Sequence, residues 1–418
     1  MSEGAAGVAA TVPVAFRTLG CKVNRVESDT IAAELLGRGI RLASEDEARV
    51  VVINTCTVTA EADAKARKAV RQALRAASRP VVVVTGCLAA LDADALRGLG
   101  ERVVVEADKA QVAGRVAMLL DLDGPSGASV VRAGNAFRTR AILKVEDGCD
   151  NFCTYCIVPF ARGVPRAVPL ADAVADAEGL AAAGVREIVL TGINIGRYRD
   201  PSTGADLATL IRAIAGTGVT RLRLSSIEPP DLTDRLLATL AGIPAVCEHL
   251  HVPLQSGNDA VLTAMGRAYT AGQYSSWIEQ ARAAIPGLAV TTDVIAGFPG
   301  EVPEHHAETL AFVERTGFSK LHVFRYSSRP GTAAAAMPQV PPELRSHRAT
   351  ELRGLGSALR DRYVASRAGS HAEVLVERVR NGVATGTTRD YLHVCVPAMV
   401  SVAEGDLVET VLSARDVR

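Results

Sequence analysis

Three short runs of mostly β-branched residues, each followed directly by a cysteine, restrict what the first part of this chain can fold into. The runs cover residues 14–20, 50–55 and 81–86 and are followed by Cys21, Cys56 and Cys87. They are too apolar to keep one face in water, and each precedes a helix-like stretch rich in Ala, Leu, Arg and Glu. A strand followed by a helix, three times over, predicts a parallel sheet with helices on both faces.

The three cysteines occupy equivalent places at the ends of these strands. In open parallel sheets, ligands collect beyond the carboxyl ends of the strands. Cysteines scattered through strands would be core residues, because free Cys packs as a small hydrophobe. We therefore predict that Cys21, Cys56 and Cys87 converge on one crevice and hold an iron–sulfur cluster with one open iron, three buried core thiols being the alternative.

A second group of cysteines lies within eight residues of the chain. Cys149, Cys153 and Cys156 have C-x₃-C-x₂-C spacing and follow the apolar run 141–145, which is typical of a strand. Thiolates this close on a loop can wrap one soft metal centre. A structural zinc site would need four ligands, and no fourth Cys or suitably spaced His follows. A zinc knuckle, or thiols that lie close by chance, is the alternative. Three ligands on a four-iron cluster leave one iron open.

This spacing resembles the signature of the radical S-adenosylmethionine (SAM) superfamily, and Tyr155 fits the aromatic residue usual between the last two cysteines. The resemblance implies that the amino and carboxylate groups of SAM bind the open iron. It also implies that the reduced cluster cleaves SAM and releases a 5′-deoxyadenosyl radical.

After a turn-rich linker at 121–127, apolar strand candidates alternate with helical stretches. The candidates are residues 141–146, 186–192, 221–227, 248–254, 289–298 and 320–326. Six strand–helix units are too few to close an eight-unit barrel, but they suit the partial barrel that the resemblance implies. The fold class we predict is α/β: an open parallel domain, a partial (β/α)6 barrel and a small C-terminal β-barrel.

The loops after the barrel strands should carry the active groups. Glycine lets a backbone approach a ligand, while Asn, Ser and Gln can bond ribose hydroxyls and the adenine edge. By resemblance these loops line the SAM pocket, together with a loop at 297–301. The cofactor-binding candidates are Tyr155, Gly192, Asn194, Ser226, Glu228 and Gln255.

A three-cysteine α/β domain followed by this signature resembles the methylthiotransferase family, whose members insert a methylthio group into an unreactive carbon–hydrogen bond. The resemblance implies two 4Fe-4S clusters and two uses of SAM. One molecule methylates a sulfur held at the cluster of the first three cysteines. A second provides the radical that activates carbon 2 of the target adenine.

Segments 18–24, 54–59 and 85–87 most resemble the branch that acts on threonylcarbamoyladenosine at position 37 of tRNA. Lys22 and Val23 follow the first cysteine, where the branch acting on a ribosomal protein usually has proline. Methylthiolation of isopentenyladenosine in tRNA, or of a ribosomal protein aspartate, is the alternative. A two-cluster electron carrier without catalysis is a remote one.

After a Pro-rich connector and a charged helix, residues 371–377, 387–396 and 406–412 are predicted strands. They resemble a TRAM domain, a small β-barrel that binds RNA. From Arg367 onward, however, there are six Arg against seven Asp and Glu, so this part is not basic. We expect domains at 12–124, 135–366 and 367–418.

Charge and composition restrict the partners that we expect for this protein. The 418 residues include 46 Lys and Arg and 46 Asp and Glu, so contact with nucleic acid must come from local patches. The helix expected after Cys56 is one candidate, a solvated helix face being the alternative. Its basic residues are Lys65, Arg67, Lys68, Arg71, Arg75 and Arg79.

The N-terminus lacks a basic start with an apolar core, and the apolar runs are too short to span a bilayer. We expect a cytoplasmic protein without a membrane partner, whose cysteines serve metal or redox chemistry and not disulfides. The implied partners are the tRNA anticodon loop, an electron donor such as flavodoxin or ferredoxin, and a sulfur source. We expect Cys247 and Cys395 to be packing or surface thiols, and we expect His305 and His306 to be exposed to solvent.

Overall fold

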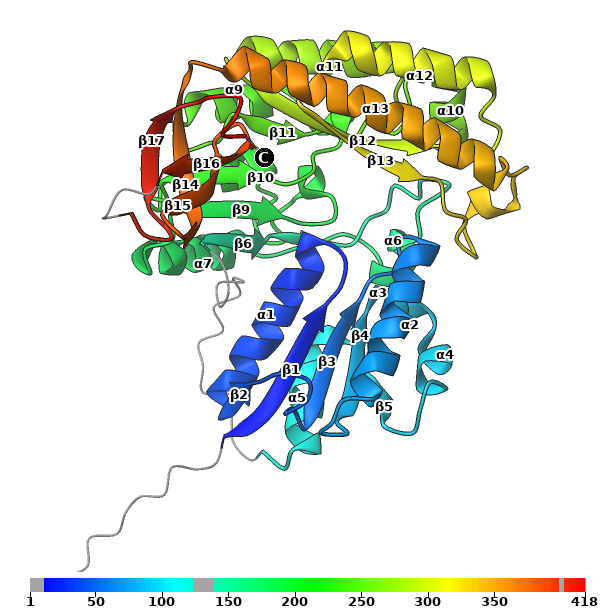
Figure 1. The fold of residues 1–418 in the computed structure, drawn as a ribbon, viewed down its shortest axis with the longest axis vertical. Helices are drawn as coiled ribbons and strands as arrows, with labels where there is room; N and C mark the ends of the chain where they lie inside the picture. Colours follow the sequence, from blue (N-terminus) through cyan, green and yellow to red (C-terminus); the bar gives the residue numbers. More distant parts are fainter. Residues whose placement is uncertain (1–10, 123–138, 398–401, 418) are drawn as a thin grey trace, which may run out of the picture. The chain divides into compact units, whose positions relative to one another are not determined.

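The computed structural model describes residues 11–122, 139–397 and 402–417, and the chain divides into two compact units, Met1–Ala136 and Phe137–Arg418 (Figure 1). The boundaries expected at 124 and 135 lie outside the described residues. No helix in the described ranges is both long and apolar enough to cross a membrane.

The first unit is built on a five-stranded parallel sheet with the order β2-β1-β3-β4-β5. The three predicted strands are present as β1, β3 and β4. Two edge strands of three residues each, β2 and β5, are too short to stand out in the sequence. The bounds are β1 Val12–Thr18, β2 Ile40–Leu42, β3 Val50–Thr55, β4 Val81–Gly86 and β5 Val103–Val105.

Helices cover both faces of this sheet, as predicted. Successive side chains of β3 point to opposite faces: Val52 packs with α1 and α5, whereas Val51 and Ile53 pack with α2. Two apolar cores result, one on each side. The helices are α1 Lys22–Gly37, α2 Ala60–Leu74, α3 Cys87–Leu91, α4 Ala93–Arg97 and α5 Val112–Leu119, with a 3₁₀ turn η1 at Lys109–Gln111.

The second unit holds two three-stranded parallel sheets, β10-β9-β6 and β11-β12-β13, and isolated parallel bridges link the β10 segment to the β11 segment. All six predicted strands are present, and helices alternate with them. The fold class predicted for this part is confirmed, with an open barrel. The strands are β6 Arg140–Lys144, β9 Glu187–Thr191, β10 Arg221–Leu224, β11 His249–His251, β12 Ala289–Ala296 and β13 Lys320–Arg325, with a short antiparallel pair β7 Glu146–Asp147 and β8 Arg166–Ala167.

Four helices of the second unit, α8 to α11, have an Asp, Thr or Asn side chain as N-cap. Thr270, for example, caps α11 and forms a capping box with Gln273. The helices are α6 Val158–Arg162, α7 Leu170–Ala182, α8 Leu207–Ala215, α9 Asp234–Gly242, α10 Asp259–Ala264, α11 Ala271–Ala284, α12 Pro303–Thr316 and α13 Pro342–Arg367, with 3₁₀ turns η2 Ile195–Arg197, η3 Pro229–Asp231 and η4 Ala333–Ala336.

The chain ends in a four-stranded antiparallel sheet with the order β16-β15-β14-β17. The strand expected at 387–396 is wrong: the ladder is interrupted there, because Tyr391 donates its N–H to the Thr388 carbonyl and closes a turn between β15 and β16. The strands are β14 His371–Arg380, β15 Val383–Thr388, β16 His393–Pro397 and β17 Leu407–Val411.

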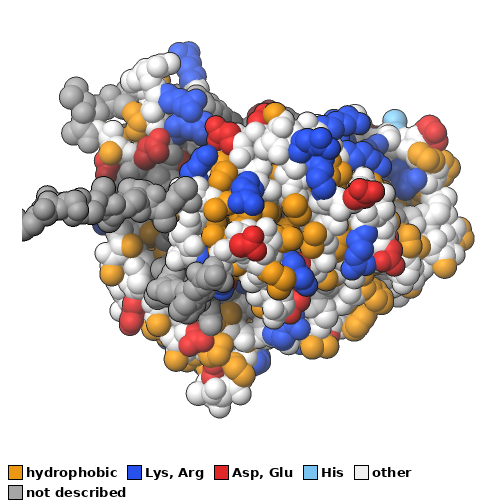
Figure 2. Space-filling view, turned by 90° about the horizontal axis from the view of Figure 1, so that it is seen from below, with side chains coloured by type: hydrophobic (Ala, Val, Ile, Leu, Met, Phe, Trp, Pro, Cys, Tyr) orange, Lys and Arg blue, Asp and Glu red, His pale blue; other side chains and the backbone are white. Residues whose placement is uncertain are grey.

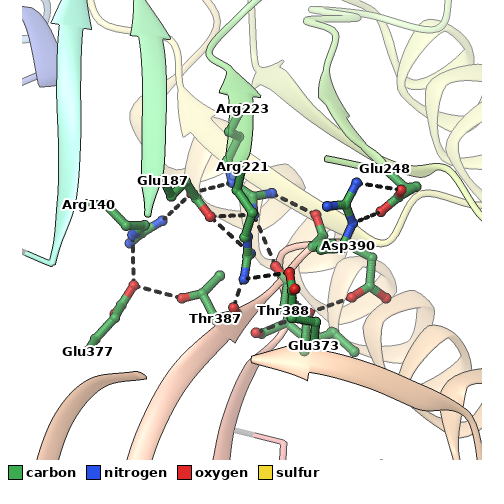
Figure 3. Close-up of polar contacts among 12 residues, drawn as sticks. Arg140, Glu187, Arg221, Arg223, Glu248, Glu373, Glu377, Thr387, Thr388 and Asp390 are labelled. Carbon is green, nitrogen blue, oxygen red and sulfur yellow. Dashed lines mark hydrogen bonds and ion pairs between the residues drawn. The ribbon is translucent and has the colours of Figure 1, made fainter. Parts of the chain in front are cut away.

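A buried ionic group lies where this sheet meets the barrel strands (Figure 3). Glu187 on β9 is fully buried and accepts from Arg221 at 2.9 Å and Arg223 at 2.8 Å, both on β10 and both buried. Burial alone would raise the pKa of Glu187, but the two guanidinium groups, Arg223 foremost, hold it below its usual value. The carboxylate is therefore charged and satisfied inside the protein.

The same two arginines reach the C-terminal sheet. Arg221 donates to the carbonyl of Thr387 at 3.2 Å, and Arg223 donates to the carbonyl of Thr388 at 3.0 Å (Figure 3). The Arg223 guanidinium also lies 4.9 Å from the ring centre of Tyr391. Charge-assisted bonds of this kind fix the sheet to the barrel strands, because leaving either arginine unpaired in the interior would be costly.

Candidate functional site

Cys149, Cys153 and Cys156 lie on the loop between β7 and α6, and glycine shapes its start. Gly148 has φ +90°, and a Cβ there would lie 2.2 Å from the Val164 carbonyl oxygen, so this close approach requires glycine. The N–H of Cys149 donates to the Gly163 carbonyl at 3.0 Å, which closes the loop on itself.

The middle of this loop is tied to the end of α10. Thr154 donates its N–H to the Met265 carbonyl at 3.0 Å and its hydroxyl to the Ala264 carbonyl at 2.8 Å. The N–H of Cys156 donates to the Cys153 carbonyl at 2.9 Å, which turns the chain between the last two thiols. The three sulfurs are thus displayed by a braced loop and stay partly accessible.

Three thiols on one loop are donors of the type that an iron–sulfur cluster takes. Within the described residues, no three His, Cys, Asp or Glu side chains come close enough together to hold one metal ion. The ligands of a four-iron cluster bind separate iron atoms and need not meet at one point. Burial raises the pKa of Cys156 to about 12 and also raises the pKa of Cys149. Thiolates at these positions would therefore owe their charge to the iron they bind.

Arg267, which the sequence analysis missed, contacts this group. Its guanidinium donates to the sulfur of Cys153 at 3.3 Å, forms an ion pair with Glu228 and lies 5.0 Å from the ring centre of Tyr269. The structure thus brings Glu228, a predicted SAM contact, to an arginine that also touches a cysteine of the triad.

The loop after β9 rests on a buried carboxylate, Glu146, which the sequence analysis also missed. Its Oε2 accepts the N–H of Ile193 at 2.9 Å and that of Asn194 at 2.7 Å. A Cβ on Gly192 would lie 2.7 Å from the same oxygen, so glycine is required for this fit. Burial, foremost, raises the pKa of Glu146 to about 7.

Polar atoms around this loop are left without partners. The side chain of Asn194 is 3% exposed, and neither its oxygen nor its nitrogen has a hydrogen-bond partner among the described residues. The second carboxylate oxygen of Glu146 is equally unpartnered there. Buried polar groups are nearly always satisfied, so these atoms fit a polar ligand such as SAM or ordered water.

The other predicted SAM contacts are more dispersed. Tyr155 packs edge-on against Phe298, with ring centres 6.4 Å apart, as part of an apolar cluster. Ser226 forms an isolated bridge with His251 at the end of β10. Gln255 has φ +67°, which is uncommon outside glycine, and both its backbone groups bond to β12.

A cavity of about 660 Å³ opens beside two of the thiols. Its volume is in the range of pockets that bind small molecules. Cys153 and Cys156 line one side, and the segment 331–336 lines the other. Two exposed aromatic rings at its edge, Phe152 and Phe160, meet at 78° with centres 5.9 Å apart.

In the first unit, the strand ends bring the other triad together. Cys21 is exposed at the start of α1, while Cys56 and Cys87 are buried. Burial, foremost, raises the pKa of Cys56, and the neighbouring Cys87 and Cys21 add to the rise. Gly20 has φ +95°, and a Cβ there would lie 2.5 Å from the Cys56 Cβ, so only glycine lets the two loops approach this closely.

Asn24 fastens two of these strand-end loops to each other. Its side-chain nitrogen donates to the carbonyls of Leu19 at 2.8 Å and Thr55 at 2.9 Å, on either side of the crevice. Between β1 and β3 the strand order reverses, and such a reversal is where parallel sheets bind ligands. The crevice therefore has the chemistry and position for a second cluster.

Three residues outside the sites test smaller predictions. Cys247 is buried, as expected of a packing thiol, and Cys395 is half-buried. His306 is not solvated: it is buried at the start of α12, and its Nε2 lies 2.9 Å from a carboxylate oxygen of Glu351. The helix α13 covers it, which the local sequence does not reveal.

Residues 13–106 match the family described as "Uncharacterized protein family UPF0004", and residues 143–313 match the Radical SAM superfamily. The chain is 37% identical to the "Threonylcarbamoyladenosine tRNA methylthiotransferase MtaB" of Bacillus subtilis over 91% of this chain and 89% of that protein. Identity to the MtaB of Chlamydia pneumoniae is 35%, over 93% of each chain.

A relative named for another tRNA nucleoside is nearly as similar. The "tRNA-2-methylthio-N(6)-dimethylallyladenosine synthase" of Syntrophobacter fumaroxidans is 36% identical over 89% of this chain and 87% of that protein. Among solved structures, the radical SAM methyltransferase TsrM of Kitasatospora setae shares the fold, with TM-score 0.56 and 15% identity over 78% of this chain and 77% of that chain.

Proposed function

This chain belongs to the radical SAM methylthiotransferase family, and we propose that it adds a methylthio group to carbon 2 of N6-threonylcarbamoyladenosine at position 37 of tRNA. Similarity over nine-tenths of the chain to relatives named for tRNA methylthiolation supports the reaction class. Lys22 and Val23 after the first cysteine support the threonylcarbamoyladenosine branch.

The observation that carries the proposal is the pair of cysteine triads, each displayed beyond the ends of parallel strands in its own unit. Cys149, Cys153 and Cys156 would hold a 4Fe-4S cluster, which supplies the electron that cleaves SAM when bound. Two residues of this chain, Arg267 and Glu146, would hold the cysteine loop and the neighbouring turn in place around it. Arg267 donates to Cys153, and Glu146 holds the backbone of the 192–194 turn so that Asn194 can meet the cofactor.

We assign a second 4Fe-4S cluster to Cys21, Cys56 and Cys87, which would carry the sulfur that is transferred. Gly20 permits the close approach of two strand-end loops, and Asn24 ties them together, so the thiols are held in place before any cluster binds.

The reaction needs an electron donor and a sulfur source from outside the chain. A flavodoxin or a ferredoxin fits the first role, because both deliver single electrons to clusters at low potential. The target base is suited to an enzyme of this kind, since recognition of RNA favours unstacked loop bases that can be splayed into a pocket.

Methylthiolation of isopentenyladenosine is the second candidate, because one relative named for that type of product is 36% identical. Mass spectrometry of digested tRNA from a deletion strain separates the two. We expect loss of 2-methylthio-N6-threonylcarbamoyladenosine and accumulation of its unthiolated parent. Loss of the isopentenyl derivative would move the assignment to the sister branch, and an unchanged profile would exclude both tRNA substrates.

A further inference from the structure

One exposed face of α2 carries a row of basic side chains. Lys68 and Arg71 lie in α2 and Arg75 is its C-cap, at steps of three and four residues, which places them on the same side of the helix; Arg79 lies beyond the end of the helix, four residues after Arg75. All four are exposed, while the opposite side of α2 packs on the sheet. We call these four residues the basic stripe.

No acidic side chain in the described part of the chain forms an ion pair with the basic stripe. Other basic residues of the same unit do have carboxylate partners: Arg17, Arg38, Arg41, Arg97, Lys109 and Arg115. Positions 64 and 72, which flank the stripe on the helix surface, hold Ala64 and Gln72 where a carboxylate would pair with it. Neighbouring like charges on a helix lower its stability, whereas Arg71 in the last turn and Arg75 at the C-cap lie where the helix dipole favours cations. The stripe is thus a row of positive charge without carboxylate partners.

The net charge of the chain supplies no general attraction for RNA. Basic and acidic residues number 46 each, and the C-terminal sheet region is not basic. Figure 2 shows Lys and Arg side chains gathered at the upper right of the face in view, with few acidic ones among them. Counterion release at phosphates is the main source of affinity for nucleic acid, and it requires such a local patch.

We propose that the basic stripe binds the phosphate backbone of tRNA, an inference that rests on the proposed function. Three of its four residues are arginines, whose planar guanidinium groups match phosphate oxygens in pairs. From Lys68 to Arg75 the row extends about 10 Å along the helix, so it can reach more than one phosphate. The contact carries affinity and not sequence choice, because phosphates carry no base information.

The test replaces Lys68, Arg71, Arg75 and Arg79 by Gln in the full-length reconstituted enzyme. Gln has a helix propensity close to that of Lys and Arg, so the change removes charge with little effect on α2. Binding of fluorescently labelled tRNA is measured over a series of salt concentrations. The slope of log affinity against log salt should become less steep by about three to four, roughly one per lost phosphate contact.

The matched control is the double variant R41Q/R97Q, which removes two exposed, paired arginines of the same unit and should leave the slope unchanged. Single R71Q and R75Q variants, each expected to lower the slope by about one, keep the test valid if the fourfold variant melts early. An unchanged slope in a folded stripe variant overturns the inference. If the stripe variant keeps its affinity for tRNA but loses binding to phosphatidylserine vesicles that the wild type binds, the stripe contacts a membrane surface and the inference is overturned as well.

The result is separable from the proposed function. If the wild-type enzyme itself shows no salt-dependent tRNA binding, the tRNA substrate fails and the inference fails with it. If the wild type binds tRNA and makes the expected nucleoside while the stripe variant binds equally well, only the inference about the stripe is overturned.

Discussion

Glu146 is the residue whose role the geometry defines most sharply. It is 1% exposed, and one of its oxygens accepts two successive backbone N–H groups, those of Ile193 and Asn194. A buried N–H that loses its acceptor costs roughly 1–3 kcal/mol, so the turn would not keep its conformation without this carboxylate. Glu146 is thus a positioning residue for the 192–194 turn, which we propose binds SAM.

We predict that Glu146→Leu weakens SAM binding at least about tenfold, because both N–H groups of the turn lose their acceptor. Glu146→Gln keeps an acceptor oxygen of the same shape and should retain most of the affinity. Equilibrium dialysis of SAM with anaerobically reconstituted protein measures the difference, and iron content serves as the control. Equal SAM binding by the Leu variant and the wild type would show that the turn does not depend on this carboxylate.

At the same scale, the limits of sequence reasoning have a physical cause. The six cysteines and Asn194 could be picked out because spacing or position after a strand marks them. Arg267 and Glu146 could not, since their roles depend on contacts between segments that only folding brings together. Buried, unpartnered atoms at Asn194 show how the structure adds a ligand signal that composition does not contain.

Among the elements, the strand-end loops of the first unit are shaped by glycine at fixed places. Gly20 and Gly39 have nearly equal φ, +95° and +87°, but a Cβ would collide with Cys56 at Gly20 and meet nothing within 4 Å at Gly39. Substitution at Gly39 therefore measures backbone strain alone. Substitution at Gly20 adds a steric clash with a cysteine of the first triad.

We predict that Gly39→Ala costs roughly 1–2 kcal/mol of stability and leaves about eight iron atoms bound after reconstitution. Gly20→Ala should lose more stability and hold only about four, because Cys56 is displaced. Thermal unfolding and iron analysis of both variants give the comparison. If Gly20→Ala binds as much iron as Gly39→Ala, the close approach of the two loops does not matter for the cluster.

The elements also show which parts of the fold the sequence could predict. Strands β3 and β4 are continuous β-branched runs and were predictable, as were the six barrel strands. The edge strands β2 and β5 have three residues each, too few to form a pattern. The turn between β15 and β16 falls inside a run of strand-forming residues, so only the hydrogen bond of Tyr391 to Thr388 reveals it.

For the second unit as a whole, the buried group around Glu187 decides whether the C-terminal sheet stays attached. Removing this carboxylate would leave Arg223 buried without a carboxylate partner and Arg221 with only Glu373, 3.7 Å away, and breaking a buried ion pair costs roughly 3–5 kcal/mol. The folded state lowers the pKa of Glu187 from its ordinary value of 4.5, so the charged carboxylate stabilises the fold fully at any pH above 4.5. The effect is lost only as pH falls through the lower value of the folded state.

We predict that Glu187→Ala speeds hydrogen exchange in β14–β17 while the first unit exchanges as in the wild type. Glu409→Gln, on the exposed side of β17, is the control and should change nothing. Exchange followed by mass spectrometry reports each strand separately. Equal protection of the C-terminal sheet in the Glu187→Ala variant would mean that other contacts hold it.

The division of labour between the two triads is the central claim for the whole molecule, and two triple variants test it most directly. In Cys149/Cys153/Cys156→Ala, iron should fall from about eight atoms to about four, and reductive cleavage of SAM should vanish. In Cys21/Cys56/Cys87→Ala, iron should fall equally, SAM cleavage should persist, and no methylthio group should reach tRNA. Iron that does not fall in either variant, or zinc bound in its place, would contradict the account.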